Sequence, residues 1–164
     1  AIGQEIAGIF NIQSAPVIME FLVNRERELY LLEAIPEFGG EFIADIMIPA
    51  ATGYNHIRNL VTAVSGGGFT KPGKRNVPSP VVVKYITGTE GILASCSTDA
   101  VKTMENIIFT RIFKHIGDRI QPPATNHDRI GVIAAKGKTI EAALNAAETA
   151  QQMMNIRIKG ENDG

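Results

Sequence analysis

The sequence lacks several features that would point to a particular class of protein. Cysteine occurs once, at Cys96, which excludes an intrachain disulfide and a cysteine-based zinc site and favours a reducing compartment. The 16 basic and 17 acidic side chains leave no basic excess that would bind nucleic acid or an anionic membrane. No apolar run reaches the roughly 18–20 residues of a membrane span, and no signal peptide opens the chain. We therefore expect a cytoplasmic protein with no nucleic-acid and no membrane partner.

What is present is the composition of an ordinary globular domain. The 164 residues are 45% hydrophobic and 20% charged, which excludes intrinsic disorder and suffices for a hydrophobic core. We predict one domain over residues 1–164. The chain begins at Ala1 in a segment whose Ile2, Ile6 and Ile9 have helical spacing. A start inside a helix leads us to expect the back part of a longer protein.

The apolar patterns predict an α+β fold, in which an antiparallel sheet has flanking helices. Strand-like runs occur at 16–23, 28–35, 81–87, 90–96, 107–113, 128–137 and 156–159. The first two runs flank a polar turn and predict a β-hairpin, and the third and fourth predict a second hairpin. The last run is expected to be an edge strand.

Helical patterns follow the first hairpin and close the chain. A helix is expected to begin near Glu41 and to end or kink near Ile48, because Pro49 lies inside the pattern. Further helices are expected at 54–65, at 98–104 and from Thr139, which is placed as an N-cap. The stretch 65–80 is rich in glycine and proline and predicts a loop, in which Lys71, Lys74 and Arg75 are expected to be solvated.

Two glutamates interrupt the apolar strands of the first hairpin. Glu20 lies within VIMEFLV and Glu33 within YLLEAI. A buried, unpaired carboxylate is costly, so an acid in such a run faces solvent, a partner or a metal. With a hairpin loop of two or four residues, Glu20 would oppose Leu31 and Glu33 would oppose Ile18. The two acids would then share one face as diagonal neighbours, about 7–8 Å apart at Cα.

Two acids that converge in this way predict a site for a hard cation such as Mg²⁺, completed by water and phosphate oxygens. A three-residue loop would instead place Glu20 and Glu33 on opposite faces. Spacing also leaves open that one of them only faces solvent. Gly39 and Gly40, after the second strand, would let a substrate anion approach the backbone, although a plain strand-to-helix turn explains them equally well.

The stretch VIMEFLVNRERELYLLEAIPEFGGEFIADIMIPAATGYN resembles the C-terminal subdomain of ATP-grasp enzymes. In that family one strand carries a metal-binding Glu, and the next carries Glu-x-Asn-x-Arg followed by Gly-Gly and a helix. The later segments VKYITGTEGIL, GDRIQPPATNHDRIGVIAAKG and TIEAALNAAETA are similar to closing segments of amino-acid ligases, phosphoribosylamine–glycine ligase and biotin carboxylase. The resemblance covers nearly the whole chain except 65–80.

The resemblance implies that Glu20 and Glu33 are the Mg²⁺ ligands that bridge the phosphates of ATP. Two positions depart from the family motif. Ile35 stands in place of Asn and cannot ligate a metal, and Glu37 stands in place of Arg and reverses the charge. A carboxylate there would repel a triphosphate rather than hold it.

The family activates a carboxylate with ATP as an acyl phosphate, which an amine then displaces. The resemblance thus implies the C-terminal portion of an ATP-grasp carboxylate–amine ligase, with ATP and Mg²⁺ as cofactors and a small carboxylate and an amine as substrates. Its partners would be the N-terminal ATP-grasp subdomains of the parent protein. The isolated chain is expected to be inactive and to expose an apolar or acidic surface, through which a homodimer could form. The alternative is a degenerate, non-catalytic ATP-grasp module for binding, assembly or regulation.

Overall fold

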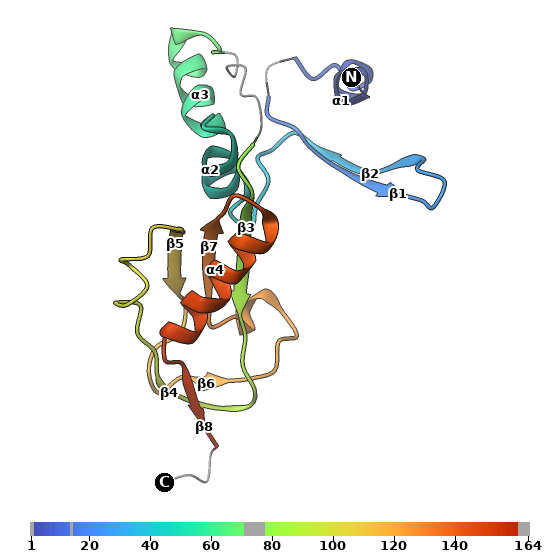
Figure 1. The fold of residues 1–164 in the computed structure, drawn as a ribbon. Coiled ribbons are helices and arrows are strands. Elements are labelled where there is room, and N and C mark those ends of the chain that lie inside the picture. Colours follow the sequence, from blue (N-terminus) through green and yellow to red (C-terminus); the bar gives the residue numbers. More distant parts are fainter. Residues whose placement is uncertain (1, 14, 71–77, 161–164) are drawn as a thin grey trace. The chain divides into compact units, whose positions relative to one another are not determined.

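The structure is a computed structural model that describes residues 2–13, 15–70 and 78–160 (Figure 1). The chain divides into two compact units. Unit 1 comprises Ala1–Asp45 and Asn55–Pro72, and unit 2 comprises Ile46–Tyr54 and Gly73–Gly164. Lys71, Lys74 and Arg75 of the predicted loop lie outside the described residues.

Unit 1 is built on the predicted N-terminal hairpin. Helix α1 (Ile2–Ile9) precedes strands β1 (Ile18–Val23) and β2 (Leu29–Ile35), which pair antiparallel. Helix α3 (His56–Thr62) begins at Asn55, whose side chain accepts a hydrogen bond from the N–H of Arg58 at 2.8 Å, and it continues into the π-helical turn η2 (Ala63–Gly67). The hairpin predicted at 16–35 is therefore confirmed.

The helix expected near Glu41 forms as two short pieces. A π-helical turn, η1 (Ile43–Met47), is followed directly by α2 (Ile48–Thr52), with Pro49 in the first positions of α2. Met47 has right-handed helical backbone, with φ −66° and ψ −50°, and α2 continues past Pro49 to Thr52. The prediction that the helix ends at about Ile48 is therefore wrong, because Pro49 stands in the first turn of α2, where its missing N–H costs no hydrogen bond.

Unit 2 contains two three-stranded antiparallel sheets and one long helix (Figure 1). One sheet has the order β3-β7-β5, formed by Val81–Ile86, Gly131–Lys136 and Ile107–Ile112. The other has the order β6-β4-β8, formed by Arg119–Ile120, Gly91–Ser95 and Arg157–Lys159. Helix α4 (Ile140–Met153) packs against β3 and β7. Every strand pair among the residues that the structure describes is antiparallel, so the predicted α+β class with flanking helices is confirmed.

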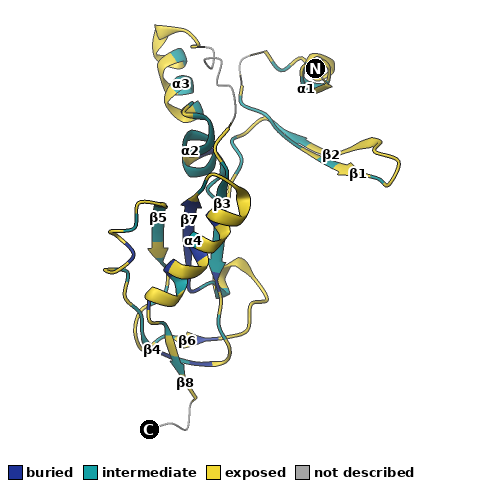
Figure 2. Cartoon of the chain, in the orientation of Figure 1, coloured by how far each residue is buried: buried dark blue, intermediate teal, exposed yellow. Residues whose placement is uncertain are grey.

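The core of unit 2 lies between β7 and α4 (Figure 2). Five of the six residues of β7 are buried, and Ala143, Ala147 and Ala150 of α4 have no exposed surface. The small alanine side chains let the helix approach the sheet closely. Thr139 caps α4 as predicted, because its hydroxyl accepts a hydrogen bond from the N–H of Ala142 at 3.1 Å.

Two local predictions for unit 2 are wrong. The runs 81–87 and 90–96 do not form a hairpin, because β3 pairs with β7 whereas β4 pairs with β6 and β8. In the connection between them Gly88 packs closely, since a Cβ there would lie 2.3 Å from Cδ1 of Ile158. The helix predicted at 98–104 is a turn, in which the carbonyl of Thr98 accepts from the N–H groups of Val101 and Lys102.

None of the helices within the described ranges has the length and apolar character needed to cross a membrane.

Candidate functional site

The N-terminal hairpin turns through three residues, Arg25 to Arg27. The N–H of Asn24 donates to the carbonyl of Glu28, and the N–H of Arg27 donates to the carbonyl of Asn24, both at 3.1 Å. Arg27 has a φ of 64°, in the left-handed region. A turn followed by one left-handed residue is typical of three-residue hairpin loops. The predicted loop of two or four residues is therefore wrong.

A β-bulge compensates for the length of this loop. Phe21 pairs with Leu31, but the next pair is Glu20 with Glu33, so Leu32 is an extra residue on β2. The predicted pairing of Glu20 with Leu31 is wrong, and the expectation that a three-residue loop separates the two glutamates is wrong as well. The extra residue returns Glu33 to the face of Glu20.

Glu20 and Glu33 are consequently directly opposed rather than diagonal. Directly opposed residues have Cβ atoms about 4.5–5.5 Å apart, so the two glutamates lie closer together than the diagonal neighbours that the sequence predicted. Both side chains are exposed, and neither makes a hydrogen bond or ion pair with another residue in the described ranges. Two like charges in this position repel each other, so the pair is poised to accept a cation between its oxygens.

The carboxylate oxygens of this pair suit a hard cation whose remaining ligands are not protein side chains. Within the part of the chain that the structure describes, no group of three or more His, Cys, Asp or Glu side chains is placed to hold a metal. Mg²⁺ is commonly held by one or two carboxylates, with waters and phosphate oxygens completing an octahedron. The two glutamates therefore fit a magnesium ion that is shared with a phosphorylated ligand.

The Gly39–Gly40 turn lies against the same face of the hairpin. A Cβ on Gly39 would lie 2.9 Å from Cδ1 of Ile18, which is two residues from Glu20 and thus on its side of the sheet. A larger residue at position 39 would therefore push against the side chain of Ile18. Gly40 has open space at its Cβ position, with no other atom of the described residues within 4 Å.

Left-handed backbone follows this turn directly. Glu41 and Phe42 have φ values of 57° and 66°, a conformation that side-chain-bearing residues seldom adopt, and the π-helical turn η1 begins at the next residue. The carbonyl of Gly40 accepts a hydrogen bond from the N–H of Ile43 at 3.0 Å. Glu20, Glu33 and Gly39 thus share one side of the hairpin, and Gly40 follows in the turn.

The two positions that depart from the family motif lie next to this face. Ile35 pairs with Ile18 and is half-buried, two residues from Glu33 on the same side of β2. Glu37 is exposed in the turn that follows, and its N–H donates to the carbonyl of Ile35 at 2.9 Å. An apolar side chain therefore borders the glutamate pair, and a third carboxylate follows in the next turn.

Two cavities of unit 2 were not anticipated from the sequence. One of about 730 Å³ has the Lys84–Glu148 ion pair in its wall, and one of about 300 Å³ includes Arg111 and Lys114. Each gathers residues from several elements, so no local motif could have indicated them. Cys96 lines the smaller cavity, and its burial raises the pKa of the thiol, which suits an inert side chain.

Comparison with known proteins finds one matching family model, which covers part of unit 2. Residues 84–159 match the family model "L-amino acid ligase C-terminal domain 2". A comparison with the curated proteins finds no significant match.

Solved structures match over nearly the whole chain. Phosphoribosylglycinamide synthetase from Anaerococcus prevotii is 18% identical with a TM-score of 0.82, covering 96% of this chain and 40% of that one. L-amino acid ligase from Bacillus licheniformis is 16% identical with a TM-score of 0.75, covering 98% and 41%. N5-carboxyaminoimidazole ribonucleotide synthetase from Thermotoga maritima is 13% identical with a TM-score of 0.60, covering 96% and 41%. At these identities the structures show a common fold.

The chain thus spans about two-fifths of the length of these enzymes. Its fold agrees with the one that the sequence predicted, a C-terminal subdomain of the ATP-grasp type. The matched family model and the three structural relatives are all ATP-grasp enzymes, and the predicted resemblance of this chain to the C-terminal subdomain of that superfamily is confirmed.

Proposed function

We propose that this chain is the C-terminal portion of an ATP-grasp carboxylate–amine ligase and that Glu20 and Glu33 hold the Mg²⁺ of bound ATP. The observation that carries the proposal is the direct opposition of the two glutamates across β1 and β2. Both carboxylates are exposed and have no protein partner in the described ranges, so their oxygens are available to a metal. The matches to ATP-grasp ligases support the same assignment.

In this proposal the two glutamates would hold the metal ion, and the two glycines would leave room for the substrates. When bound, Mg²⁺ neutralises the charge of the phosphates and favours transfer of a phosphoryl group to a carboxylate. Glu20 and Glu33 would position that ion. Gly39 and Gly40 would line the space for the small carboxylate and amine substrates, with Gly40 offering the open backbone. Phosphate release by the complete, cytoplasmic enzyme would follow attack of the amine on the acyl phosphate.

We also propose that the hairpin packs against the N-terminal ATP-grasp subdomains of the parent protein. Six large apolar or aromatic side chains of the hairpin are between 38% and 59% exposed: Leu22, Val23, Leu29, Tyr30, Leu31 and Leu32. An exposed apolar surface of this kind typically marks an interface. Because the matched enzymes are about 2.5 times as long as their matched part, the parent would supply the covering segment. The isolated chain would therefore be inactive.

The alternative is a degenerate ATP-grasp module that serves binding, assembly or regulation without nucleotide chemistry. The observation that favours it is the nature of the two residues that follow Glu33 at the motif positions. Ile35 offers no ligand atom, and the exposed Glu37 adds negative charge where a triphosphate would lie.

Calorimetric titration of Mg²⁺-ATP into the full-length protein separates the two candidates. The ligase assignment predicts binding that requires Mg²⁺ and is lost in Glu33→Gln. Glu26→Gln is the matched control, because it removes a carboxylate from the loop of the same hairpin without touching the opposed pair. Absence of binding by the folded protein, or equal loss in both variants, would reject the assignment of Glu20 and Glu33 and leave the non-catalytic module.

The interface has a separate test. Hydrogen exchange of the β1 and β2 amides is compared between the full-length protein and the 164-residue chain. Slower exchange in the full-length protein supports a covering subdomain. Equal rates, or protection of the isolated chain that rises with its concentration, would point instead to an uncovered hairpin or to a homodimer.

A further inference from the structure

The smaller cavity of unit 2 has apolar walls of limited extent. Its volume is about 300 Å³, and its apolar lining comes from Leu93 of β4, Ile112 of β5 and Ile116 of the following turn. Leu93 is completely buried, so this part of the wall belongs to the core. Cavities that bind small molecules range from about 300 to 1,000 Å³, so the ligand that fits here is compact.

The polar wall of this cavity is positively charged. Arg111, in β5, and Lys114, in the turn beyond it, both line the cavity, and none of the lining residues that the structure describes is acidic. Neither cation makes an ion pair within 4.0 Å in the described ranges. Asp128 attracts Lys114 from a greater distance, but its carboxylate is engaged by the N–H groups of Ala124 and Thr125 at 3.0 and 2.7 Å. The positive charge of the cavity is therefore incompletely balanced by the protein.

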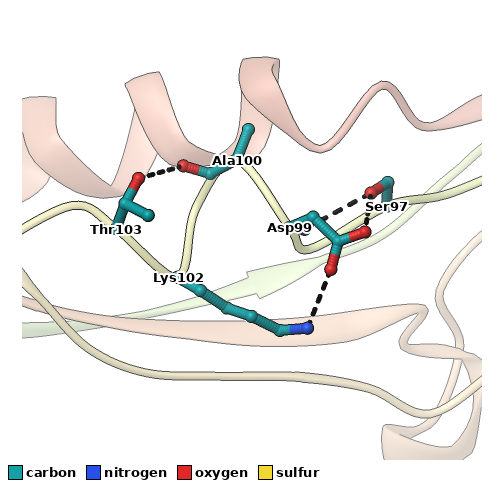
Figure 3. Close-up of polar contacts among 5 residues, drawn as sticks. All are labelled: Ser97, Asp99, Ala100, Lys102 and Thr103. Carbon is teal, nitrogen blue, oxygen red and sulfur yellow. Dashed lines mark hydrogen bonds and ion pairs between the residues drawn. The ribbon is translucent and has the colours of Figure 1, made fainter.

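The turn that follows β4 is held by local hydrogen bonds, some of which Figure 3 shows. Thr98 lines the cavity, and its carbonyl accepts hydrogen bonds from the N–H groups of Val101 and Lys102 at 3.1 and 3.2 Å. Val101 is completely buried and anchors the turn in the core. The ammonium group of Lys102 donates a hydrogen bond to the carboxylate of Asp99 at 2.8 Å, so the negative charge of this turn is already paired (Figure 3). A wall held in place in this way loses little freedom when a ligand binds.

A second hydroxyl of the wall lacks a partner. Oγ1 of Thr110 is buried and has no hydrogen-bond partner in the part of the chain that the structure describes. Buried polar atoms without partners are rare in folded proteins and call for a specific explanation. A ligand with an acceptor oxygen in the cavity that Thr110 lines is one such explanation.

The larger cavity, by contrast, carries balanced charge. Its lysine, Lys84, lies 3.5 Å from Glu148, and the rest of its polar wall consists of side-chain amides and hydroxyls. It therefore selects no ligand of a particular charge.

We propose that the cavity lined by Arg111, Lys114, Thr98 and Thr110 binds a small oxyanion, either a phosphate group or a carboxylate on a compact body. The guanidinium of Arg111 suits both groups, because its parallel N–H donors match two oxygens of either. The site lies wholly within unit 2 and is distinct from the glutamate pair of unit 1, so it is additional to the proposed ATP site.

The test is an NMR titration of the full-length protein with inorganic phosphate and, separately, with acetate. We expect saturable chemical-shift changes at the backbone amides of residues 93–98 and 110–116. The probe that binds more tightly, phosphate or acetate, would show which of the two groups the site prefers. Arg111→Gln should weaken binding about tenfold or more, as expected for loss of a charge-assisted hydrogen bond. Lys138→Gln is the control, because it removes an exposed lysine that does not line the cavity.

The outcomes also separate this site from the proposed ATP site. Glu33→Gln should leave the cavity shifts unchanged even if it abolishes Mg²⁺-ATP binding. Absence of saturable shifts with both probes would overturn the proposal. So would equal weakening in Arg111→Gln and Lys138→Gln, since that result would show general attraction to surface charge.

Discussion

Glu20 and Glu33 face each other directly across β1 and β2, and the extra residue Leu32 is what brings them into register. Without the bulge, the three-residue loop would pair Glu20 with Leu32 and turn Glu33 to the other side. An irregularity in the strand pairing thus creates the opposed carboxylates. Bulges are over-represented beside active sites, where they re-aim a side chain.

The first prediction concerns the repulsion between these carboxylates. Glu20→Gln should stabilise the hairpin by about 0.2–1 kcal/mol in the absence of metal, because like charges directly opposite are unfavourable. The measurement is the opening free energy of the β1–β2 amides from native-state hydrogen exchange. Added Mg²⁺ should increase protection in the wild type and not in the variant. A destabilised Glu20→Gln hairpin would mean that the carboxylate has a structural partner.

The second prediction addresses the turn beside the pair. Gly40→Ala should leave stability within about 0.5 kcal/mol of the wild type, since a Cβ meets open space there. If a substrate approaches this backbone, the same variant should lower amino-acid-dependent phosphate release by the full-length protein. Thermal unfolding and a phosphate-release assay, run in parallel, provide the two readouts. Unchanged activity would assign Gly40 to the turn alone.

The third prediction tests the cap of the long helix. Thr139→Ala should destabilise unit 2 by about 1 kcal/mol, because the N–H of Ala142 loses its acceptor. Urea unfolding followed by circular dichroism measures the loss. Lys138→Ala, at the neighbouring exposed position, should change stability by much less. Equal losses in the two variants would show that the hydroxyl contributes nothing specific.

The fourth prediction concerns acid stability. Hydrogen bonds from the backbone N–H groups of Thr125 and Ala124, then from the Thr125 hydroxyl, lower the pKa of Asp128, with a smaller effect of Lys114. A carboxyl whose pKa is lower in the folded state contributes stability above its unfolded pKa of about 3.9. That contribution should be lost as the pH falls through the folded pKa.

Urea midpoints measured between pH 6 and pH 2 check this dependence. Asp128→Asn should flatten the fall below about pH 4, since its side chain does not titrate in this range. An unchanged slope in the variant would show that other carboxyls account for the acid sensitivity of unit 2.

Local signals in the sequence predicted the elements that depend on neighbouring residues. Thr139 was recognisable as a cap because a hydroxyl before an alanine-rich run satisfies the first free N–H groups of a helix. Pro49, by contrast, predicted a helix end but stands in the first turn of α2, where its missing N–H costs no hydrogen bond. The run 16–35 predicted its hairpin from two apolar segments around a polar turn, and that pairing involves only adjacent strands.

Contacts between distant segments were decided by tertiary packing. β7 is almost wholly buried between β3 and β5, and it takes the place beside β3 that the sequence pattern had assigned to the run 90–96. The register between two strands is set by turn geometry and bulges, and a shift of one residue moves every side chain of a strand to the opposite face of the sheet. The sequence therefore determined that Glu20 and Glu33 interrupt neighbouring strands. Only the folded hairpin decided that they oppose each other, and only the assembled unit 2 brought Thr98 to the cavity of Arg111.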